Sequence, residues 1–285
     1  MAEDMTTPTP PRIISIAGSD SSGGAGVQAD IKTITMLGGY AMTAITAITA
    51  QNTVGVQGIA ALAPEMVAQQ IASCISDIGV DAIKIGMLHD AAIIGAVAEA
   101  LAGLGAPIVL DPVMIATSGA ALIAPDAVAA MRGRLFPLAT LITPNLPELA
   151  HLVGRPLTTT ADMVEAAEEL AEATGAAVLA KGGHMTGLSG AAGRDGRIID
   201  VLYFPTTATH GPRAVQFDHA RIDTRHTHGT GCTLSSAIAT LLGHGQPLEH
   251  AVRLGRQFVI RAIEAAPGFG AGGGPLGHQA VRSLT

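Results

Sequence analysis

One short segment, THGTGCTLSS at residues 227–236, combines the residue types needed to bind an anion and to act on it. Cys232 follows Gly229 and Gly231 at the point where a helix is predicted to begin. The free N–H groups and the dipole of a helix start favour a bound anion, and phosphate is the obvious one. The same position lowers the pKa of a thiol, so we expect Cys232 to be available as a thiolate. An ordinary capping loop is the plainer interpretation of the pattern.

Two kinds of chemistry fit this segment, beside a structural role. Cys232 could be a nucleophile with His228 as its base, as in a cysteine hydrolase. It could instead accept or position the proton of a substrate hydroxyl while neighbouring backbone N–H groups stabilise a transferred phosphoryl group. In the structural interpretation the side chain is a small buried hydrophobe, which is the role that we assign to Cys74.

Other polar residues follow the ends of predicted strands. Asn145 and Glu148 in TPNLPEL offer oxygen atoms at a spacing that suits Mg²⁺ held partly through water. Asp111 ends another strand, and Lys181 supplies a point cation for phosphates. Each residue alone could be an ordinary turn, helix-start or surface residue. Together they favour a crevice built for a polar ligand.

A glycine-rich loop after the first predicted strand matches the dinucleotide-binding fingerprint only in part. Gly24, Gly26 and Ala29 have the required spacing, but no acidic residue occurs from Ile31 to Pro64 to hold a ribose. We therefore interpret the loop as one that approaches a small ligand closely, which glycines permit because they have no Cβ.

Charge and composition exclude several classes of partner. A net charge of −7 over 285 residues disfavours a polyanion such as nucleic acid. Two cysteines do not make a disulfide framework, and the acidic, Pro- and Thr-rich first residues do not resemble a targeting leader. Residues 33–64 carry no charge, but their Thr, Gly, Gln and Asn content indicates a buried strand rather than a membrane span. We expect a cytoplasmic protein.

Short apolar runs alternate with longer Ala-rich periodic ones along the chain. Predicted strands cover 12–18, 40–49, 81–86, 107–111, 139–145 and 176–183, with a strand pair at 197–205 and about 214–222. Predicted helices cover 26–38, 64–79, 90–105, a stretch between 111 and 139, 160–175 with Thr160 as cap, about 230–242 and 247–265.

This alternation predicts an α/β fold of three layers, with a mostly parallel central sheet and helices on both faces. We find no linker and no internal repeat, so residues 1–11 form a flexible tail and 12–285 a single domain. In such sheets ligands bind beyond the carboxyl ends of the strands, where Asp111, Asn145 and Lys181 fall.

A set of motifs carries a family resemblance. They are IAGSDSSGGAGVQADIKT, ITAQNTVGVQ, KIGM, LDPVM, TPNLPE, KGGH and THGTGCTLSSAIA. The set resembles the hydroxymethylpyrimidine/phosphomethylpyrimidine kinases of thiamine biosynthesis, in the ribokinase superfamily, over nearly the whole chain. The resemblance implies a ribokinase-like fold, Mg²⁺, a homodimer, and ATP-dependent phosphorylation of 4-amino-5-hydroxymethyl-2-methylpyrimidine and then of its monophosphate.

The resemblance also implies roles for individual residues. Cys232 stands where most of the superfamily has an aspartate base. Glu148 is implied to serve Mg²⁺. The residues implied to bind the pyrimidine are Gly18, Asp30, Gln51, Met87 and Val113. The residues implied to bind nucleotide and phosphate are Asp111, Asn145, Lys181, Gly229, Thr230 and Gly231.

Two positions depart from the family pattern: Ser21 stands where proline is usual, and Arg225-His226 where Lys-Asn is more usual. The nearest alternative is a pyridoxal or pyridoxine kinase, although Gln51 followed by Asn52 favours an aminopyrimidine. A non-catalytic sensor that binds the pyrimidine is another. Residues 185–196 and the tail from 267 are candidate mobile segments.

Overall fold

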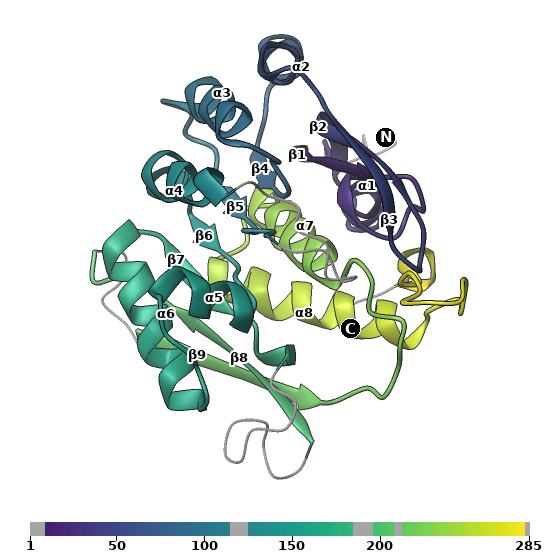
Figure 1. Ribbon diagram of the computed structural model, residues 1–285, viewed down its shortest axis with the longest axis vertical. Helices are drawn as coiled ribbons and strands as arrows, with labels where there is room; N and C mark the ends of the chain where they lie inside the picture. Colours follow the sequence, from purple (N-terminus) through teal and green to yellow (C-terminus); the bar gives the residue numbers. More distant parts are fainter. Residues whose placement is uncertain (1–8, 115–124, 185–195, 208–212, 283–285) are drawn as a thin grey trace, which may run out of the picture.

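The computed structural model describes residues 9–114, 125–184, 196–207 and 213–282, which form a nine-stranded sheet between two layers of helices (Figure 1). The strand order is β3-β2-β1-β4-β5-β6-β7-β8-β9. Neighbours from β2 to β7 pair in parallel, whereas β3, β8 and β9 pair antiparallel. The strands are β1 (Arg12–Asp20), β2 (Tyr40–Gln51), β3 (Val56–Ala61), β4 (Ala82–Ile85), β5 (Ile108–Leu110), β6 (Leu141–Ile142), β7 (Ala177–Ala180), β8 (Arg197–Tyr203) and β9 (Ala214–Ala220).

The helices divide between the two faces of the sheet. One face carries α1 (Gly26–Met36), α7 (Thr230–Gly243) and α8 (Leu248–Glu264), which pack on one another and on β1, β4 and β5. The other face carries α2 (Pro64–Asp77), α3 (Ala91–Leu101), α4 (Pro125–Arg134), α5 (Leu146–Val153) and α6 (Thr160–Thr174). Short 3-10 turns are η1 (Phe136–Leu138), η2 (Gly182–His184) and η3 (His278–Ala280). The predicted three-layer arrangement is confirmed.

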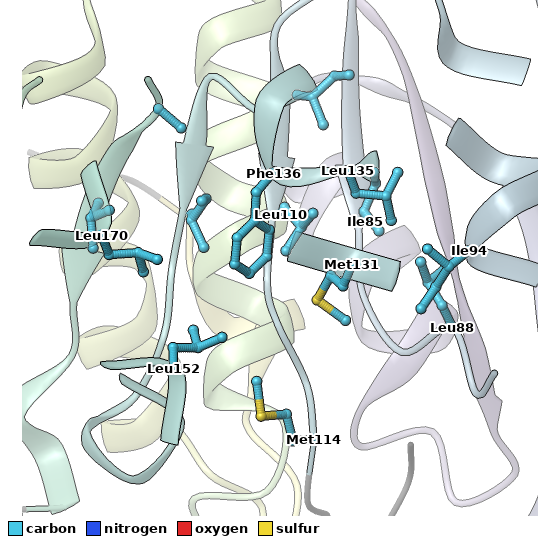
Figure 2. Close-up of a cluster of buried hydrophobic side chains, with 14 of the residues drawn as sticks. Ile85, Leu88, Ile94, Leu110, Met114, Met131, Leu135, Phe136, Leu152 and Leu170 are labelled. Carbon is cyan, nitrogen blue, oxygen red and sulfur yellow. The ribbon is translucent and has the colours of Figure 1, made fainter. Parts of the chain in front are cut away.

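Both faces of the central strands are buried, which explains why these strands, Lys84 of β4 apart, are apolar without alternation. Every residue of β4 and β7 is buried. On the face covered by α2 to α6, Ile85 and Leu110 meet Met131 and Phe136 in the cluster of Figure 2. This packing holds the strands rigidly, and their carboxyl ends carry the loops described below.

Glycines end several helices where the sequence predicts, because they accept the left-handed conformation. Gly175 has φ of 74° and closes α6, and Gly38 has φ of 78° just after α1. The predicted cap of α6 is wrong by one residue. Thr159, not Thr160, accepts the N–H of Asp162, whose side chain in turn accepts the Thr159 N–H.

Two elements were not predicted. Strand β3 pairs antiparallel with β2 at the sheet edge, and nearly all of its side chains are exposed, so it has no hydrophobic alternation to reveal it. Helix α5 is only eight residues long, and the pattern of Asn145 and Glu148 at its start fits oxygen ligands for Mg²⁺ as well as a helix start. The strand pair β8–β9 is confirmed.

Some expectations fall on other parts of the chain. Residues 1–8 of the predicted tail and 185–195 of the predicted mobile loop lie outside the described residues. The division into a tail and one domain stays a prediction. Among the helices that the structure describes, each is too short or too polar to traverse a lipid bilayer.

Candidate active site

A cavity of about 1130 Å³ opens beyond the carboxyl ends of the parallel strands, where open α/β sheets bind ligands. It is lined by residues from β1, β2 and the loops after β4 to β7, together with α5, β8, β9, α7 and α8. The structure brings twelve of the thirteen predicted site residues to its wall. These are Gly18, Gln51, Met87, Asp111, Val113, Asn145, Glu148, Lys181, Gly229, Thr230, Gly231 and Cys232.

The loop after β1 and the start of α7 meet beside the cavity, and they approach so closely that the residues at the contact must be glycines. Gly229 caps α7 with φ of 87°, and a Cβ there would lie 1.9 Å from the carbonyl oxygen of Gly24. Gly26 begins α1 with φ of 55°, and a Cβ there would lie 2.3 Å from the carbonyl oxygen of Gly18. The glycine-rich loop after β1 and the start of α7 therefore touch through backbone atoms.

The start of α7 has the arrangement that the sequence analysis expects of an anion site. The first N–H groups of a helix have no partner inside it, and the residues that carry them here, Thr230, Gly231 and Cys232, line the cavity. A Cβ on Gly231 would lie 3.1 Å from Asp111 Oδ2 and 3.4 Å from Lys181 Nζ. The helix start thus lies directly beside a carboxylate and a cation.

The expectation of a Cys232 thiolate is wrong. Burial raises the pKa of the Cys232 thiol to about 11, and Asp30 and Asp111 add to the rise. Lys84 and a hydrogen bond from the Gly26 N–H oppose it without overcoming it. The helix start alone predicts a lower pKa, but the protein packed around the sulfur outweighs it. Cys232 is therefore a neutral thiol in the free protein.

Asp111 and Lys181 form a largely buried ion pair at the ends of β5 and β7, with β6 between them. Lys181 Nζ lies 2.8 Å from Asp111 Oδ1, which also accepts the Thr143 hydroxyl at 3.1 Å. Burial opposes the charge of Lys181, but Asp111 and Glu148 raise its pKa above the usual value. The ammonium is held charged against the wall of the cavity, as a group that binds phosphate must be.

Asn145 and Glu148 first serve helix α5. Asn145 Oδ1 accepts the Glu148 N–H at 2.9 Å, and Glu148 Oε2 accepts the Asn145 N–H at 2.8 Å, so the two form a capping box. Both also line the cavity. Burial raises the pKa of Glu148 to about 7; Lys181 lowers it and Asp111 raises it further. Glu148 is a carboxyl that a nearby cation would readily deprotonate.

The other end of the cavity combines apolar side chains with the carboxamide of Gln51, which lies beside Thr49 and His228. Gly18 and Met87 touch, because a Cβ on Gly18 would lie 2.6 Å from Met87 Cε. Val113 lies on the same wall, and Gln51 at the end of β2 reaches into it. A flat ring with one polar edge suits these surroundings.

Asp30 does not reach the cavity, so the predicted contact with a pyrimidine is not what the structure shows. Its carboxylate is fully buried and lies 2.7 Å from Lys84 Nζ. It also accepts the hydroxyls of Ser15 at 2.5 Å and Ser236 at 2.6 Å. Its three partners, Ser15, Lys84 and Ser236, are also fully buried and do not line the cavity. Asp30 therefore links strands β1 and β4 to helix α7 in the interior beneath the site.

Sequence reasoning missed a second charged group at the far end of the cavity. Asp200 on β8 accepts the Gly182 N–H at 2.8 Å and binds Arg256 at 2.7 Å. Arg256 also contacts His219, whose pKa burial and the guanidinium lower. The sequence offered one signal for this group: Asp200 is the only acidic residue within the apolar run RIIDVLYF, where a buried charge needs a partner. Apolar side chains complete this end of the cavity: Ile198, Ile222, Leu234, Val259 and Ile263.

Comparison with known proteins gives a consistent result. A family model described as phosphomethylpyrimidine kinase matches residues 20–277. The chain is similar to a hydroxymethylpyrimidine/phosphomethylpyrimidine kinase of Streptomyces coelicolor, with 44% identity over 278 residues, which cover 96% of this chain and 98% of that protein. It is also 44% identical over 267 residues to the thiamine biosynthesis bifunctional protein ThiED of Geobacter sulfurreducens, covering 93% of this chain and 52% of that longer protein.

The structural comparison shows the fold and a rival activity. The crystal structure of an ADP complex of Bacillus subtilis pyridoxal kinase superposes with a TM-score of 0.83 and 35% sequence identity, covering 96% of this chain and 99% of that one. Enzymes with this architecture thus include kinases of more than one ring-shaped substrate.

Proposed function

The chain belongs to the phosphomethylpyrimidine kinase family, and from this we propose that it transfers the γ-phosphoryl group of ATP to 4-amino-5-hydroxymethyl-2-methylpyrimidine, then to its monophosphate. The observation that carries the proposal is the meeting of the glycine-bounded start of α7, the Asp111–Lys181 pair and Cys232 in one cavity. ATP supplies the phosphoryl group and leaves as ADP. The product of the second step is the diphosphate, an intermediate of thiamine biosynthesis.

The pyrimidine occupies the end formed by Gly18, Met87, Val113 and Gln51. Met87 packs on the ring, and Gly18 leaves room for it because a Cβ would already collide with Met87 Cε. Gln51 reads the polar edge of the ring through its carboxamide. The apolar group of α7, α8 and β8 side chains at the far end accommodates the adenine.

The transferred phosphoryl group lies between these ends, at the start of α7. The Thr230 N–H donates to the Thr227 carbonyl, so the next N–H groups of the helix, those of Gly231 and Cys232, donate to the phosphoryl oxygens. Lys181 neutralises negative charge on the nucleotide phosphates. Such a transition state needs positioning and charge stabilisation more than a strong base. Cys232 therefore orients the substrate hydroxyl as a neutral thiol. The hydroxyl proton passes to an oxygen of the transferred phosphoryl group as the new O–P bond forms and the bond to ADP breaks.

The donor set near Lys181 fits Mg²⁺. Asp111 and Glu148 present carboxylates to the cavity, and their mutual repulsion contributes to the raised pKa of Glu148. Within the described ranges no group of three or more His, Cys, Asp or Glu could enclose a metal ion. Two carboxylates with waters and substrate phosphates are what Mg²⁺ prefers. When bound, Mg²⁺ would neutralise phosphate charge, while Asn145 keeps Glu148 aimed at the cavity.

Mg²⁺ affinity is expected to decrease as the pH is lowered, because protons compete with Mg²⁺ for the Glu148 carboxylate. With a pKa of about 7, the carboxylate is mostly charged at pH 8 and mostly protonated at pH 6. Affinity at pH 6 should be about tenfold weaker than at pH 8. Calorimetric Mg²⁺ titrations in buffers of different ionisation enthalpy would also detect protons released at pH 6.5. The variant Glu148→Gln keeps an oxygen that can accept the Asn145 N–H, and it should lose this pH dependence. Equal Mg²⁺ affinities at pH 6 and pH 8 for the unmodified protein would contradict the role of Glu148 in binding Mg²⁺.

Pyridoxal kinase is the second candidate, favoured by the structural likeness described above. The decisive experiment measures ADP release with Mg-ATP and, separately, hydroxymethylpyrimidine, its monophosphate and pyridoxine. We expect turnover of both pyrimidines and slow turnover of pyridoxine. Turnover of pyridoxine alone would assign the chain to vitamin B6 salvage, and no ADP release with any of them would contradict the kinase proposal.

A cysteine hydrolase is not supported by the geometry. His228 Nε2 is hydrogen-bonded to Asp20 at 2.8 Å, and the Cys232 thiol is neutral in the free protein. We also propose a homodimer, for which the exposed apolar side chains of Tyr40, Ile48 and Ile59 along β2 and β3 are the support. The two free cysteines are consistent with a cytoplasmic setting.

A further inference from the structure

Asp20, at the end of β1, collects an unusual number of hydrogen-bond donors. Its buried carboxylate accepts the N–H groups of Ser22, Gly24 and Ala25 and the Ser22 hydroxyl, at 2.7 to 3.2 Å. It also lies 2.8 Å from His228 Nε2. Burial raises the pKa of Asp20, but the bonds from His228, Ser22 and Ala25 outweigh burial and lower it to about 2. Asp20 is therefore an anion under any working condition.

An anionic Asp20 decides which nitrogen of His228 carries a proton. A carboxylate only accepts hydrogen bonds, so the His228 nitrogen beside it, Nε2, must be protonated and must donate. Gln51 Nε2 lies 3.4 Å from the same His228 nitrogen. With the carboxamide in that orientation, one donor faces another.

Thr49 raises the same conflict on the other side of the carboxamide. Its buried hydroxyl lies 2.8 Å from the carbonyl oxygen of Ser19 and 3.2 Å from Gln51 Oε1. A hydroxyl has one hydrogen, and the shorter contact takes it, so two acceptors face each other at Gln51. A 180° rotation of the carboxamide exchanges its nitrogen and oxygen within the same volume. Each donor then meets an acceptor.

We propose that Thr49 and His228, the latter locked by Asp20, fix the carboxamide of Gln51 with its oxygen toward His228 and its nitrogen toward Thr49, and thereby set the specificity of the ring site. Thr49 and His228 are positioning residues in this arrangement. Gln51 keeps one amide hydrogen and one oxygen lone pair for a ligand. The inference rests on the proposed function and extends it to the recognition of the ring edge.

The fixed carboxamide offers one donor and one acceptor in a set order. A 4-aminopyrimidine presents a ring nitrogen that accepts and an amine that donates, which match the order. In a 4-oxopyrimidine the ring N–H donates and the carbonyl accepts, so the pattern is reversed. A Gln51 carboxamide that could rotate would bind both rings. A fixed carboxamide rejects the 4-oxo ring, because its donor would then face a donor of the ring and its acceptor would face an acceptor.

The test compares equilibrium binding of the 4-amino and 4-oxo forms of hydroxymethyl-methylpyrimidine by calorimetry without ATP. The unmodified protein should bind the amino form at least about tenfold more tightly. Thr49→Val keeps the side-chain shape but removes the hydroxyl that accepts from Gln51, so the preference should fall by about tenfold. Thr49→Ser keeps the hydroxyl and should keep the preference. Thr49→Ala, with the same expected loss, replaces the valine variant if valine does not fold.

The outcomes separate this inference from the proposed function. ADP binding and the thermal unfolding temperature first show that each variant is folded. If the unmodified protein binds the amino form and a folded Thr49→Val or Thr49→Ala variant keeps the full preference, the inference is wrong and the function stands. Equal binding of both forms by the unmodified protein also overturns it. If the unmodified protein binds neither ring, the proposed substrate fails and the inference with it.

Discussion

Replacing Cys232 with alanine is expected to lower kcat by about 100-fold, the cost of losing the group that positions the reacting hydroxyl. KM for the pyrimidine should change less, because in the proposed binding mode Met87, Val113 and Gln51, rather than the thiol, hold the ring. The substitution leaves the start of α7 and the Asp111–Lys181 pair in place, so phosphoryl binding should survive. Steady-state ADP release over a range of pyrimidine concentrations separates the two constants. Unchanged kcat would remove Cys232 from the mechanism.

Serine at the same position tells whether the sulfur acts as a thiolate or as a neutral group. Because burial raises the pKa of Cys232 to about 11, we expect the neutral group, and Cys232→Ser should retain far more activity than Cys232→Ala. Alkylation of Cys232 by iodoacetamide should also still accelerate between pH 8 and pH 10. Cys74→Ser supplies the background for that measurement. An alkylation rate that is already constant below pH 8 would show a thiolate instead.

Replacing Lys84 with methionine should lower the free energy of unfolding by about 3–5 kcal/mol, the effect of leaving one partner of a buried ion pair uncompensated. Lys84 and Asp30 are both fully buried, with 2.7 Å between Nζ and Oδ2. Burial disfavours the charge of Lys84, but Asp30 holds its pKa above the usual range. Without the ammonium, the Asp30 carboxylate keeps only the hydroxyls of Ser15 and Ser236. Urea unfolding followed by circular dichroism measures the loss.

The double variant Lys84→Met with Asp30→Asn is the matched control. It removes both charges, so it should recover much of the stability that the single variant loses. A double variant no more stable than Lys84→Met would mean that the cost comes from packing rather than from the orphaned carboxylate. The pair also sits beneath Cys232, since Ser236 lies one helical turn further along α7. Activity lost by the single variant should therefore return in part with the double one.

The fold was largely predictable because its central strands and helices differ in their hydrophobic period. Apolar runs such as residues 176–183 end at glycines or polar groups, and the helices between them end at glycines such as Gly175. Strand β3 could not be predicted because nearly all of this edge strand is exposed, so its sequence lacks the alternation of apolar and polar residues that marks a half-buried strand. The cap of α6 was misplaced because adjacent threonines offer the same side chain at Thr159 and Thr160.

The site was predictable as a set of residues but not as a set of interactions. The sequence points to Lys181 and Cys232. The protonation of the Cys232 thiol, however, depends on residues that pack around it from distant parts of the chain, and the local sequence does not reveal them. The family resemblance implies a ligand contact for Asp30, but the ion pair with Lys84 on β4 holds its carboxylate in the interior. The bond between Asp20 and His228 joins residues 208 positions apart, and only the fold brings them together.

The contact between the loop after β1 and the start of α7 has a consequence for how such proteins can be recombined. A Cβ at residue 229 would lie 1.9 Å from the Gly24 carbonyl oxygen, so residue 229 must be glycine while the first loop follows this path. The two loops are far apart in the sequence but share this steric constraint. A chimaera of two relatives should therefore keep glycine at this position whichever parent supplies the second half, and a shuffled library that allows another residue there is expected to lose members.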